Sequence, residues 1–540
     1  MTLTQQPGQA HVADPTDPTS RVRPTPDGMA LDAEDTFDSL SPVTGDVVGT
    51  YPIHSAEEVT AAVSAARENA AWWAALSFDE RKEHLTIWKG AMTRRLAQLA
   101  DIVHAETGKP HGDAMLEASL AIDHVAWAAG NAEKHLKRRK VSSGLLMANQ
   151  SASVAYKPLG VIGVIGPWNY PVFTPMGSIV YALAAGNAVV FKPSEYTPGV
   201  GVWLARTFQE SVGRAVFTAV TGLGETGAAL CRAGVDKLAF TGSTNTGKKV
   251  MAACAETLTP VIIEAGGKDS VIVDKDADID AAADAALWGA ASNAGQTCIG
   301  VERIYVHERV YDEFVAALVN KAKDVRADAS PGSQLGPITM PSQLEVIRSH
   351  ISDAIAKGGR ALLGGVDAVG DRFVQPTILV DVPEDSLAVQ EETFGPTVTV
   401  RKVATMEEAI ELTNATRYGL GSTVFSKERG MEIAEQVRSG MTAVNGIIAF
   451  AAIPALPFGG VGDSGFGRIH GADGLREFTY AKSIARQRFK PVMALTSFQR
   501  TDKMDAQLAQ MMTLLHGGSS TLPKDAEPTG LKRRWMRAGR

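Results

Sequence analysis

From Val161 onward, the sequence alternates short apolar runs with longer segments of helical periodicity, and this alternation limits the possible folds most strongly. The pattern predicts strands over 161–166, 188–192, 216–220 and 237–241, and helices over 175–185, 199–212, 225–233 and 244–255. A second such series runs from Val261 to about Thr442, with a helix over 279–292 and strands over 303–307 and 378–381. Strands that alternate with helices form parallel sheets covered on both faces. The sequence therefore predicts an α/β fold with two doubly wound parallel sheets.

The length of 540 residues agrees with two domains, because a single core usually stops growing at roughly 250–300 residues. Residues 1–30 are rich in Pro, Thr, Asp and Gly and are predicted to be a disordered tail. Helices are expected over 56–73, 78–107 and 112–136, followed by a short β-like arm over 141–156. Residues 496–540 lack the αβ rhythm and are interpreted as a C-terminal tail.

The bulk composition argues against several classes of partner. A net charge of -7 provides no basic field for nucleic acid. No apolar run reaches the roughly 18–20 residues of a membrane helix. Three cysteines cannot form a disulfide framework and residues 1–30 lack an apolar signal segment, so we expect a cytoplasmic protein. The last ten residues carry five basic side chains and no acid; they predict a solvated tail, with contact to an acidic membrane surface as the alternative.

Cys298 is the first candidate for chemistry. It lies between Gly295 and Gly300 in a predicted loop, where glycines let the backbone approach a ligand and expose a small side chain. Cys231 and Cys254 fall within predicted helices and are interpreted as core residues. Spacing alone leaves burial of Cys298 in a tight loop as an alternative to a nucleophile.

Glu264 and Asn169 each follow a predicted strand. A carboxylate at the carboxyl end of a strand faces the ligand crevice of a doubly wound sheet, and apolar neighbours can raise its pKa enough for a general base. The alternative for Glu264 is a surface ion pair with Lys268. Asn169 lies between Pro167 and Pro171, which stiffen the turn, so that its amide could donate to an oxyanion or only to its own turn.

Two further motifs suggest a nucleotide. Lys192-Pro193-Ser194-Glu195 follows the second strand, where an acidic side chain can bind ribose hydroxyls. The run from Thr241 to Lys249 contains Gly242 and Ser243 and opens a helix, which suits a phosphate group. It departs from a P-loop because Lys249 stands where a Ser or Thr would bind magnesium, so phosphoryl transfer is disfavoured. We expect no metal site.

Seven motifs, in this order, together resemble those of the aldehyde dehydrogenase superfamily, and the resemblance covers roughly residues 35–490. They are Pro167–Pro171, Lys192–Glu195, Phe240–Ser243, Glu264–Lys268, Gly295–Cys298, Glu391–Pro396 and Pro457–Gly460. The chain departs from the usual pattern at Ala265, where leucine is common; this changes packing beneath Glu264 but removes no functional group.

The resemblance implies a role for each matching residue. Cys298 would be the nucleophile, Glu264 the base that activates water, and Asn169 an oxyanion donor together with the backbone N–H of Cys298. Cofactor contacts are implied for a further set: Trp168, Lys192, Glu195, Gly242, Ser243, Glu392 and Phe394. Phe458 resembles an aromatic residue of the substrate tunnel, and Phe173 is expected beside it.

The resemblance also implies the domain organisation and assembly. An NAD(P)-binding domain would comprise 31–140 and 157–266, a catalytic domain 267–466, and an oligomerisation arm 141–156 and 477–491, in a homodimer or homotetramer. The predicted reaction is oxidation of an aldehyde to a carboxylic acid through a thioester. Transfer of the acyl group to coenzyme A, a non-redox cysteine hydrolase and a catalytically silent homologue are the alternatives.

Cofactor and substrate are predicted from single positions. The carboxylate of Glu195 would repel a 2′-phosphate, which favours NAD with some use of NADP. Residues 172–177 and 446–454 are largely apolar, as is Phe458. Succinate-semialdehyde enzymes of the family often carry an arginine near the position of Gly177, so its absence favours an apolar aliphatic or aromatic aldehyde over a semialdehyde.

Overall fold

The structure is a computed structural model, and it describes residues 35–491, 493 and 495–517. These residues form two compact units. The larger one comprises residues 35–137 and 155–482, and the smaller one comprises residues 138–154 together with the described residues from 483 onward. The predicted disordered segment 1–30 and the basic residues 532–540 lie outside the described residues.

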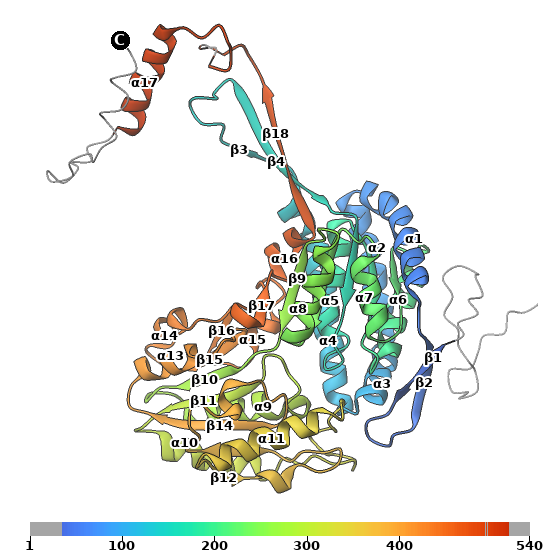
Figure 1. Ribbon diagram of the computed structural model, residues 1–540, viewed down its shortest axis with the longest axis vertical. Coiled ribbons are helices and arrows are strands. Elements are labelled where there is room, and N and C mark those ends of the chain that lie inside the picture. The colour runs from blue at the N-terminus through green and yellow to red at the C-terminus, as the bar shows by residue number, and fades with distance from the viewer. Residues whose placement is uncertain (1–34, 492, 494, 518–540) are drawn as a thin grey trace, which may run out of the picture. The chain divides into compact units, whose positions relative to one another are not determined.

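The larger unit contains a six-stranded sheet with the strand order β17-β9-β8-β5-β6-β7 (Figure 1). Five of its strands are parallel, and the short β17 pairs antiparallel with β9. The strands are β5 (Val161–Ile165), β6 (Ala188–Lys192), β7 (Phe217–Ala219), β8 (Lys237–Gly242), β9 (Val261–Ala265) and β17 (Gly465–Phe466). The predicted strands and their parallel arrangement are confirmed, with ends that differ by one or two residues.

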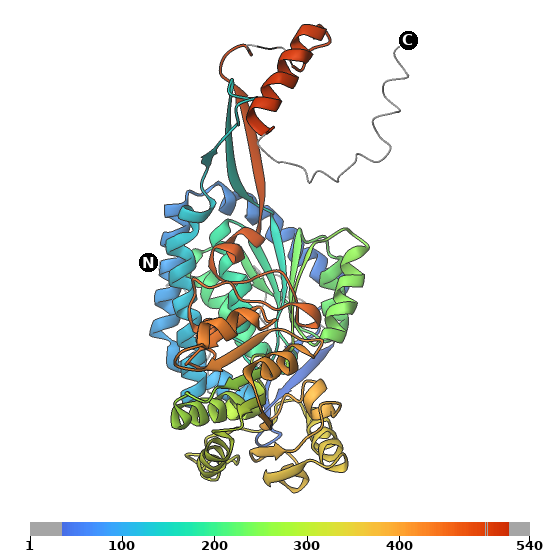
Figure 2. The same ribbon diagram turned by 90° about the vertical axis from the view of Figure 1, so that its left-hand side faces the viewer.

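Helices cover both faces of this sheet, and Figure 2 shows blue helices on one side of the strands and green helices on the other. The right-handed crossovers put α5 and α6 on one face, backed by α2 and α4, and α7 and α8 on the opposite face. The helices are α1 (Ala56–Ala75), α2 (Phe78–Arg94), α3 (Leu96–Thr107), α4 (His111–Leu136), α5 (Phe173–Ala185), α6 (Pro198–Val212), α7 (Gly224–Arg232) and α8 (Thr244–Ala255). Capping boxes at Ser55 and Ser77 start α1 and α2 by satisfying their first N–H groups.

The predicted continuous helix over 78–107 is wrong, because Arg95 interrupts it with φ -108° and ψ 22°. The buried positions continue in phase across the break, from Leu85, Trp88 and Met92 to Leu99 and others in α3. Since neither glycine nor proline marks the break, the apolar periodicity alone cannot reveal it.

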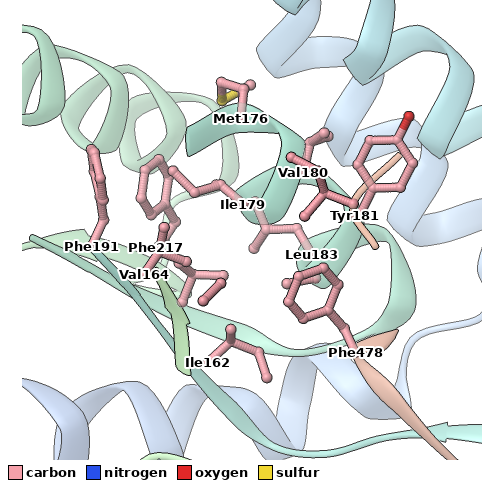
Figure 3. Close-up of a cluster of buried hydrophobic side chains, with 14 of the residues drawn as sticks. Ile162, Val164, Met176, Ile179, Val180, Tyr181, Leu183, Phe191, Phe217 and Phe478 are labelled. Atoms are coloured by element: carbon pink, nitrogen blue, oxygen red, sulfur yellow. The ribbon is translucent and has the colours of Figure 1, made fainter. Parts of the chain in front are cut away.

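The main core lies between the six-stranded sheet and α5. Figure 3 shows Ile162, Val164, Phe191 and Phe217 from the strands packed against the side chains of α5. Every residue of α5 except Phe173 is buried, which explains its nearly continuous apolar sequence. Tyr181 projects its hydroxyl away from the aliphatic side chains of this cluster (Figure 3).

The seven-stranded sheet has the order β12-β13-β14-β11-β10-β15-β16, and all its neighbours are parallel except β12 and β13. The strands are β10 (Asp269–Val273), β11 (Val301–His307), β12 (Arg360–Leu363), β13 (Thr377–Val380), β14 (Thr397–Val403), β15 (Gly421–Phe425) and β16 (Met441–Val444). The helices of this half are α9 (Ile279–Ala291), α10 (Tyr311–Ala322), α11 (Gln343–Ala356), α12 (Leu387–Gln390), α13 (Met406–Asn414), α14 (Gly430–Gln436) and α15 (Ala449–Ala452), whereas α16 (Gly471–Glu477) packs against α4 and α5 of the first half. The second predicted parallel sheet is thus confirmed.

Three further groups of elements complete the described chain. β1 (Thr36–Leu40) and β2 (Val47–Pro52) form an antiparallel hairpin. β3 (Arg139–Val141), β4 (Gln150–Pro158) and β18 (Thr479–Gln487) form a three-stranded sheet, where an arm was expected. The predicted C-terminal tail contains α17 (Asp502–His516), a helix without buried residues that Thr501 caps. No helix among the described residues is both long and apolar enough to cross a membrane.

Candidate active site

The carboxyl ends of the strands in the six-stranded sheet carry the motifs singled out above. β5 leads into residues 167–171, β6 into residues 193–195, and β8 into the turn at 242–243. β6 and β7 lie on one side of β5, whereas β8 and β9 lie on the other. Ligands of doubly wound sheets bind outside the strand ends where the chain order reverses in this way. The fold therefore gathers the candidate residues where a nucleotide is expected.

Cys298 lies in a tightly turned loop between α9 and β11. Asn293, Ala294 and Gly295 have positive φ angles of 52°, 55° and 71°. Glycine is needed at 295, because an added Cβ would lie 2.1 Å from the backbone of Gly395. Although the loop is tight, Cys298 is only partly buried.

Gln296 fastens this loop with its side chain and its backbone. The side-chain amide donates to the carbonyls of Asn293 at 2.9 Å and Pro337 at 3.2 Å, and its oxygen accepts from the N–H of Thr339 at 2.8 Å. The backbone carbonyl of Gln296 accepts a hydrogen bond of 3.0 Å from the side-chain amide of Asn169. The turn after β5 is therefore held directly against the Cys298 loop.

Two N–H donors beside Cys298 remain available to a ligand. An asparagine amide carries two N–H groups, and Asn169 uses one of them on Gln296. Within the described chain, the backbone N–H of Cys298 makes no hydrogen bond. These two donors match the requirement of an oxyanion site, namely fixed N–H groups that need no rearrangement during the reaction.

The Asn169 turn rests on a buried ion pair that the sequence analysis missed. Lys109 Nζ lies 2.6 Å from Glu117 Oε2 and donates at 2.7 Å to the backbone carbonyl of Asn169. The other oxygen of Glu117 accepts from the N–H groups of Val172 and Phe173 at 2.8 and 3.1 Å. A signal was present in the sequence, since Glu117 interrupts the apolar face of α4. Paired charges are the usual form in which lysine and glutamate are buried.

Glu264 ends up buried at the end of β9, and the alternative of a surface pair with Lys268 is wrong. Lys268 instead pairs with Glu302 in the interior. Both carboxyl oxygens of Glu264 are buried, and within the described residues neither has a hydrogen bond. Burial raises the pKa of Glu264 to about 7, although the nearby side chains of Thr241 and Cys298 partly lower it. A carboxyl with this pKa can exchange a proton near neutral pH.

The electrostatic surroundings of Cys298 favour its thiol form. Burial raises the pKa of Cys298 well above its ordinary value, and the carboxylates of Glu264, Glu392 and Asp269 raise it further. Formation of a thiolate therefore depends on a positive charge or a proton acceptor beside the sulfur.

Glu392, Trp168 and Phe394 border the same region. Glu392 accepts a hydrogen bond of 3.0 Å from the N–H of Gly267, and its carboxylate lies against Gly266, where an added Cβ would be 2.1 Å away. The rings of Trp168 and Phe394 meet edge to face with centroids 5.6 Å apart. Three of the residues expected to bind the cofactor are thus near the Cys298 loop and the end of β9.

The remaining residues expected to contact the cofactor lie along β6 and β8. Lys192 is buried, donates at 3.1 Å to the carbonyl of Pro193, and lies 3.8 Å from a carboxylate oxygen of Glu195. The ammonium group retains hydrogen-bonding capacity for ribose hydroxyls. Ser243 is exposed and caps α8. Together with Gly242 at the end of β8, these donors and the exposed helix start fit a dinucleotide.

The two residues predicted for the substrate pocket surround a histidine. His470 has its ring centroid 5.8 Å from that of Phe173 and 5.3 Å from that of Phe458. Its Nε2 would lie 2.5 Å from a Cβ added at Gly177. An imidazole therefore fills the space that a side chain at position 177 would enter, and it adds a polar group among the largely apolar residues that the sequence analysis singled out.

The sequence matches known proteins over most of its length. A model of the aldehyde dehydrogenase family matches residues 30–484. The chain is 35% identical to 4,4'-diapolycopene aldehyde oxidase of Methylomonas sp over 473 residues, 87% of each protein. It is 34% identical to the peroxisomal aminoaldehyde dehydrogenase 1 of Pisum sativum over 463 residues, 83% of this chain and 92% of that protein.

Solved structures agree with the sequence matches. The NAD-dependent aldehyde dehydrogenase from Sinorhizobium meliloti aligns with a TM-score of 0.83 and 33% identity, covering 89% of this chain and 98% of that one. Lactaldehyde dehydrogenase from Escherichia coli aligns with a TM-score of 0.80 and 30% identity, covering 85% and 97%. With a family match over most of the chain and a shared fold, this protein belongs to the aldehyde dehydrogenase family and is an NAD(P)-dependent oxidoreductase.

Proposed function

We propose that this enzyme oxidises an aldehyde to a carboxylic acid through a thioester on Cys298, which is hydrolysed by water that Glu264 activates. The observation that supports the proposal most strongly is that Glu264, Cys298 and Asn169 lie close together. The carboxyl of Glu264 and the thiol of Cys298 are close enough to shift each other's pKa, and Asn169 is bonded to the loop that carries Cys298.

In the proposed first stage, the Cys298 thiolate adds to the aldehyde carbon, and the carbonyl electron pair moves to oxygen. Asn169 and the backbone N–H of Cys298 donate hydrogen bonds to this oxygen and stabilise its charge. When bound, the oxidised nicotinamide supplies a hydride acceptor and a positive charge that favours the thiolate. Loss of the hydrogen on the former aldehyde carbon as hydride to that acceptor would leave an acyl group on Cys298 as a thioester.

In the proposed second stage, Glu264 takes a proton from a water molecule that attacks the thioester carbon. Asn169 and Cys298 N–H again hold the oxygen, and the C–S bond breaks to release the acid. Its raised pKa makes Glu264 a stronger base than an ordinary carboxylate, while leaving it largely ionised above pH 7. The retained carboxyl favours hydrolysis over transfer of the acyl group to coenzyme A.

The test is to trap the thioester. Glu264→Gln incubated with an aldehyde and cofactor should release reduced cofactor once per site, and the protein mass should rise by one acyl group on Cys298. Wild type should instead give equal amounts of acid and reduced cofactor. Continuous turnover by Cys298→Ala, or ester cleavage that ignores the cofactor, would contradict the mechanism and favour a non-redox hydrolase.

For the cofactor, we propose that NAD is preferred and NADP is used less efficiently. The carboxylate of Glu195 lies on the exposed side of Lys192, where a 2′-phosphate would be repelled. Relatives use both cofactors: a Mycobacterium ulcerans protein is provisionally named an NADP(+)-dependent succinate-semialdehyde dehydrogenase, whereas another solved relative was crystallised with NAD. Comparable kcat/KM values with the two cofactors would contradict the preference.

For the substrate and assembly, we propose an aldehyde with an apolar aliphatic or aromatic body, and a homodimer or homotetramer formed through the three-stranded sheet. The NAD(P)-binding domain would comprise 31–140 and 157–266 and the catalytic domain 267–466, in a cytoplasmic enzyme. Comparing benzaldehyde, hexanal and succinate semialdehyde with both cofactors tests the substrate class, and a preference for succinate semialdehyde would show that a semialdehyde is used instead.

A further inference from the structure

A pair of buried histidines lies beside Phe173 and Phe458, the two residues predicted for the substrate pocket. The rings of His124, from α4, and His470, just before α16, are tilted against each other at 53° with centroids 4.1 Å apart. Each residue is only 1% exposed. Phe173, Tyr181 and Phe458 surround them, with centroids 5.3–5.8 Å from that of His470.

The two histidines differ in their hydrogen bonds. His124 places one ring nitrogen 3.1 Å from the hydroxyl of Tyr181 and the other 3.4 Å from the carbonyl of Ala451. Within the described residues, neither nitrogen of His470 has a partner. An imidazole always has at least one N–H, and leaving a buried polar group unpaired is unfavourable. His470 therefore has unused hydrogen-bonding capacity in an apolar surrounding.

The backbone of His470 also adopts an unfavourable conformation. Its φ is 63° and its ψ is 165°, a region that side chains rarely occupy. Backbone strain of this kind is found preferentially at functional sites. His470 thus combines unpaired ring nitrogens with a strained backbone. A ligand that forms hydrogen bonds with the ring would remove the first of these two unfavourable features.

The position of His470 connects it to the reaction site. Its ring lies against Gly177 and Phe173, which follow the Asn169 turn. The neighbouring β17 pairs Gly465 with Glu264. Tyr181 directs its hydroxyl away from the aliphatic core (Figure 3), where it lies 3.1 Å from His124 Nδ1 and donates to the carbonyl of Pro454 at 3.0 Å.

We propose that His470, supported by His124 and Tyr181, binds a hydroxyl group at the far end of the aldehyde substrate. The substrates would then be aldehydes with an apolar or aromatic body and a remote hydroxyl. This inference rests on the proposed function and narrows its substrate class.

The protonation state of the ring favours a hydroxyl over a carboxylate. Burial, and then the neighbouring His124, hold the pKa of His470 well below its ordinary value, so the ring is neutral at physiological pH. A neutral imidazole has one donor and one acceptor, and a hydroxyl group has both as well. A carboxylate would instead enter an uncharged aromatic surrounding without a counter-charge, which is costly.

The experiment uses isosteric pairs of aldehydes with the full-length enzyme and saturating cofactor. The pairs are 4-hydroxybenzaldehyde with 4-methylbenzaldehyde, and 6-hydroxyhexanal with heptanal. One added hydrogen bond to a group that otherwise stays unpaired should favour the hydroxyl member of at least one pair about tenfold in kcat/KM. The preference should appear mainly in KM, since the contact is remote from the reacting carbon.

Substitutions test whether the histidines cause the preference for the hydroxyl member of each pair. The quantity compared is the ratio of the two kcat/KM values. His470→Leu should reduce the ratio to about one, and His470→Asn, which keeps a side chain that can donate and accept hydrogen bonds, should retain part of it. If His470→Leu does not fold, His124→Phe replaces it as the variant that weakens the ratio. His307→Gln, a change at a buried histidine in β11, is the matched control and should keep the wild-type ratio.

A wild-type ratio near one for both pairs, or a ratio that His470→Leu does not change, would overturn the inference. A preference for 4-carboxybenzaldehyde over 4-hydroxybenzaldehyde would overturn it in favour of an anionic substrate. Absence of oxidation with every aldehyde would instead contradict the proposed function itself, so the two failures are distinguishable.

Discussion

At the residue scale, Glu264 is held in a place that is unfavourable for its charge. Burial raises its pKa from 4.5 to about 7, and both oxygens lack a partner among the described residues. In an acid whose pKa is higher in the folded state, the proton binds more tightly to the folded protein. Its stabilising contribution is complete below pH 4.5 and disappears as the pH rises through 7. Reactivity and stability therefore oppose each other at this residue.

We predict that Glu264→Gln is more stable than wild type at pH 8 and similar to it at pH 5. The shift in pKa corresponds to about 3 kcal/mol, which is the upper limit of the gain. Thermal unfolding of both proteins between pH 5 and 8 measures it. A constant difference across this range would show that Glu264 titrates as an ordinary surface carboxylate.

For Asn169→Ala we predict a loss of kcat of about 10²–10³-fold with little change in cofactor affinity, because one oxyanion donor contributes about 3–4 kcal/mol. Steady-state kinetics and cofactor titration give the two quantities. The variant also removes the bond to the carbonyl of Gln296, so a thermal unfolding curve is the control for disruption of the loop. Full activity in a folded variant would exclude the assigned role.

At the scale of elements, α4 positions the turn after β5 through the buried pair of Lys109 and Glu117. We predict that Lys109→Met lowers both thermal stability and kcat, since it leaves a buried carboxylate unpaired and the Asn169 carbonyl without one of its donors. The double variant with Glu117→Gln should recover stability but not kcat. Glu256→Gln, which breaks the exposed pair with Arg232, is the control and should change neither.

The elements were largely predictable from the sequence because their apolar runs are buried in the same order that the periodicity implied. The break at Arg95 and the helix α17 were not predictable. The former keeps its buried face in phase across the break, and the latter has no buried face to produce a strong signal. Cys298, Glu264 and Asn169 were identified at fixed motifs. Lys109, Glu117 and His470 were not, because their importance lies in contacts between residues far apart in the chain.

At the scale of the whole molecule, the three cysteines occupy different environments. Cys231 and Cys254 are at most 1% exposed, whereas Cys298 is partly accessible. We predict that one thiol per chain reacts with N-ethylmaleimide in the native enzyme, slowly because the pKa of Cys298 is raised, and three react after denaturation. Cys298→Ala should show none in the native state, and a second native thiol would contradict the described burial.

Gln296 also bears on how the enzyme exchanges its cofactor. Its carbonyl is bonded to the turn after β5, and its side chain is bonded to Pro337 and Thr339 in the other half of the larger unit. If those halves opened about a hinge, the hydrogen bond between the Asn169 amide and the carbonyl of Gln296 would break in every turnover. We therefore expect the cofactor to bind and dissociate through local movement of side chains such as Glu392. The two sheets are expected to keep their relative positions during this exchange.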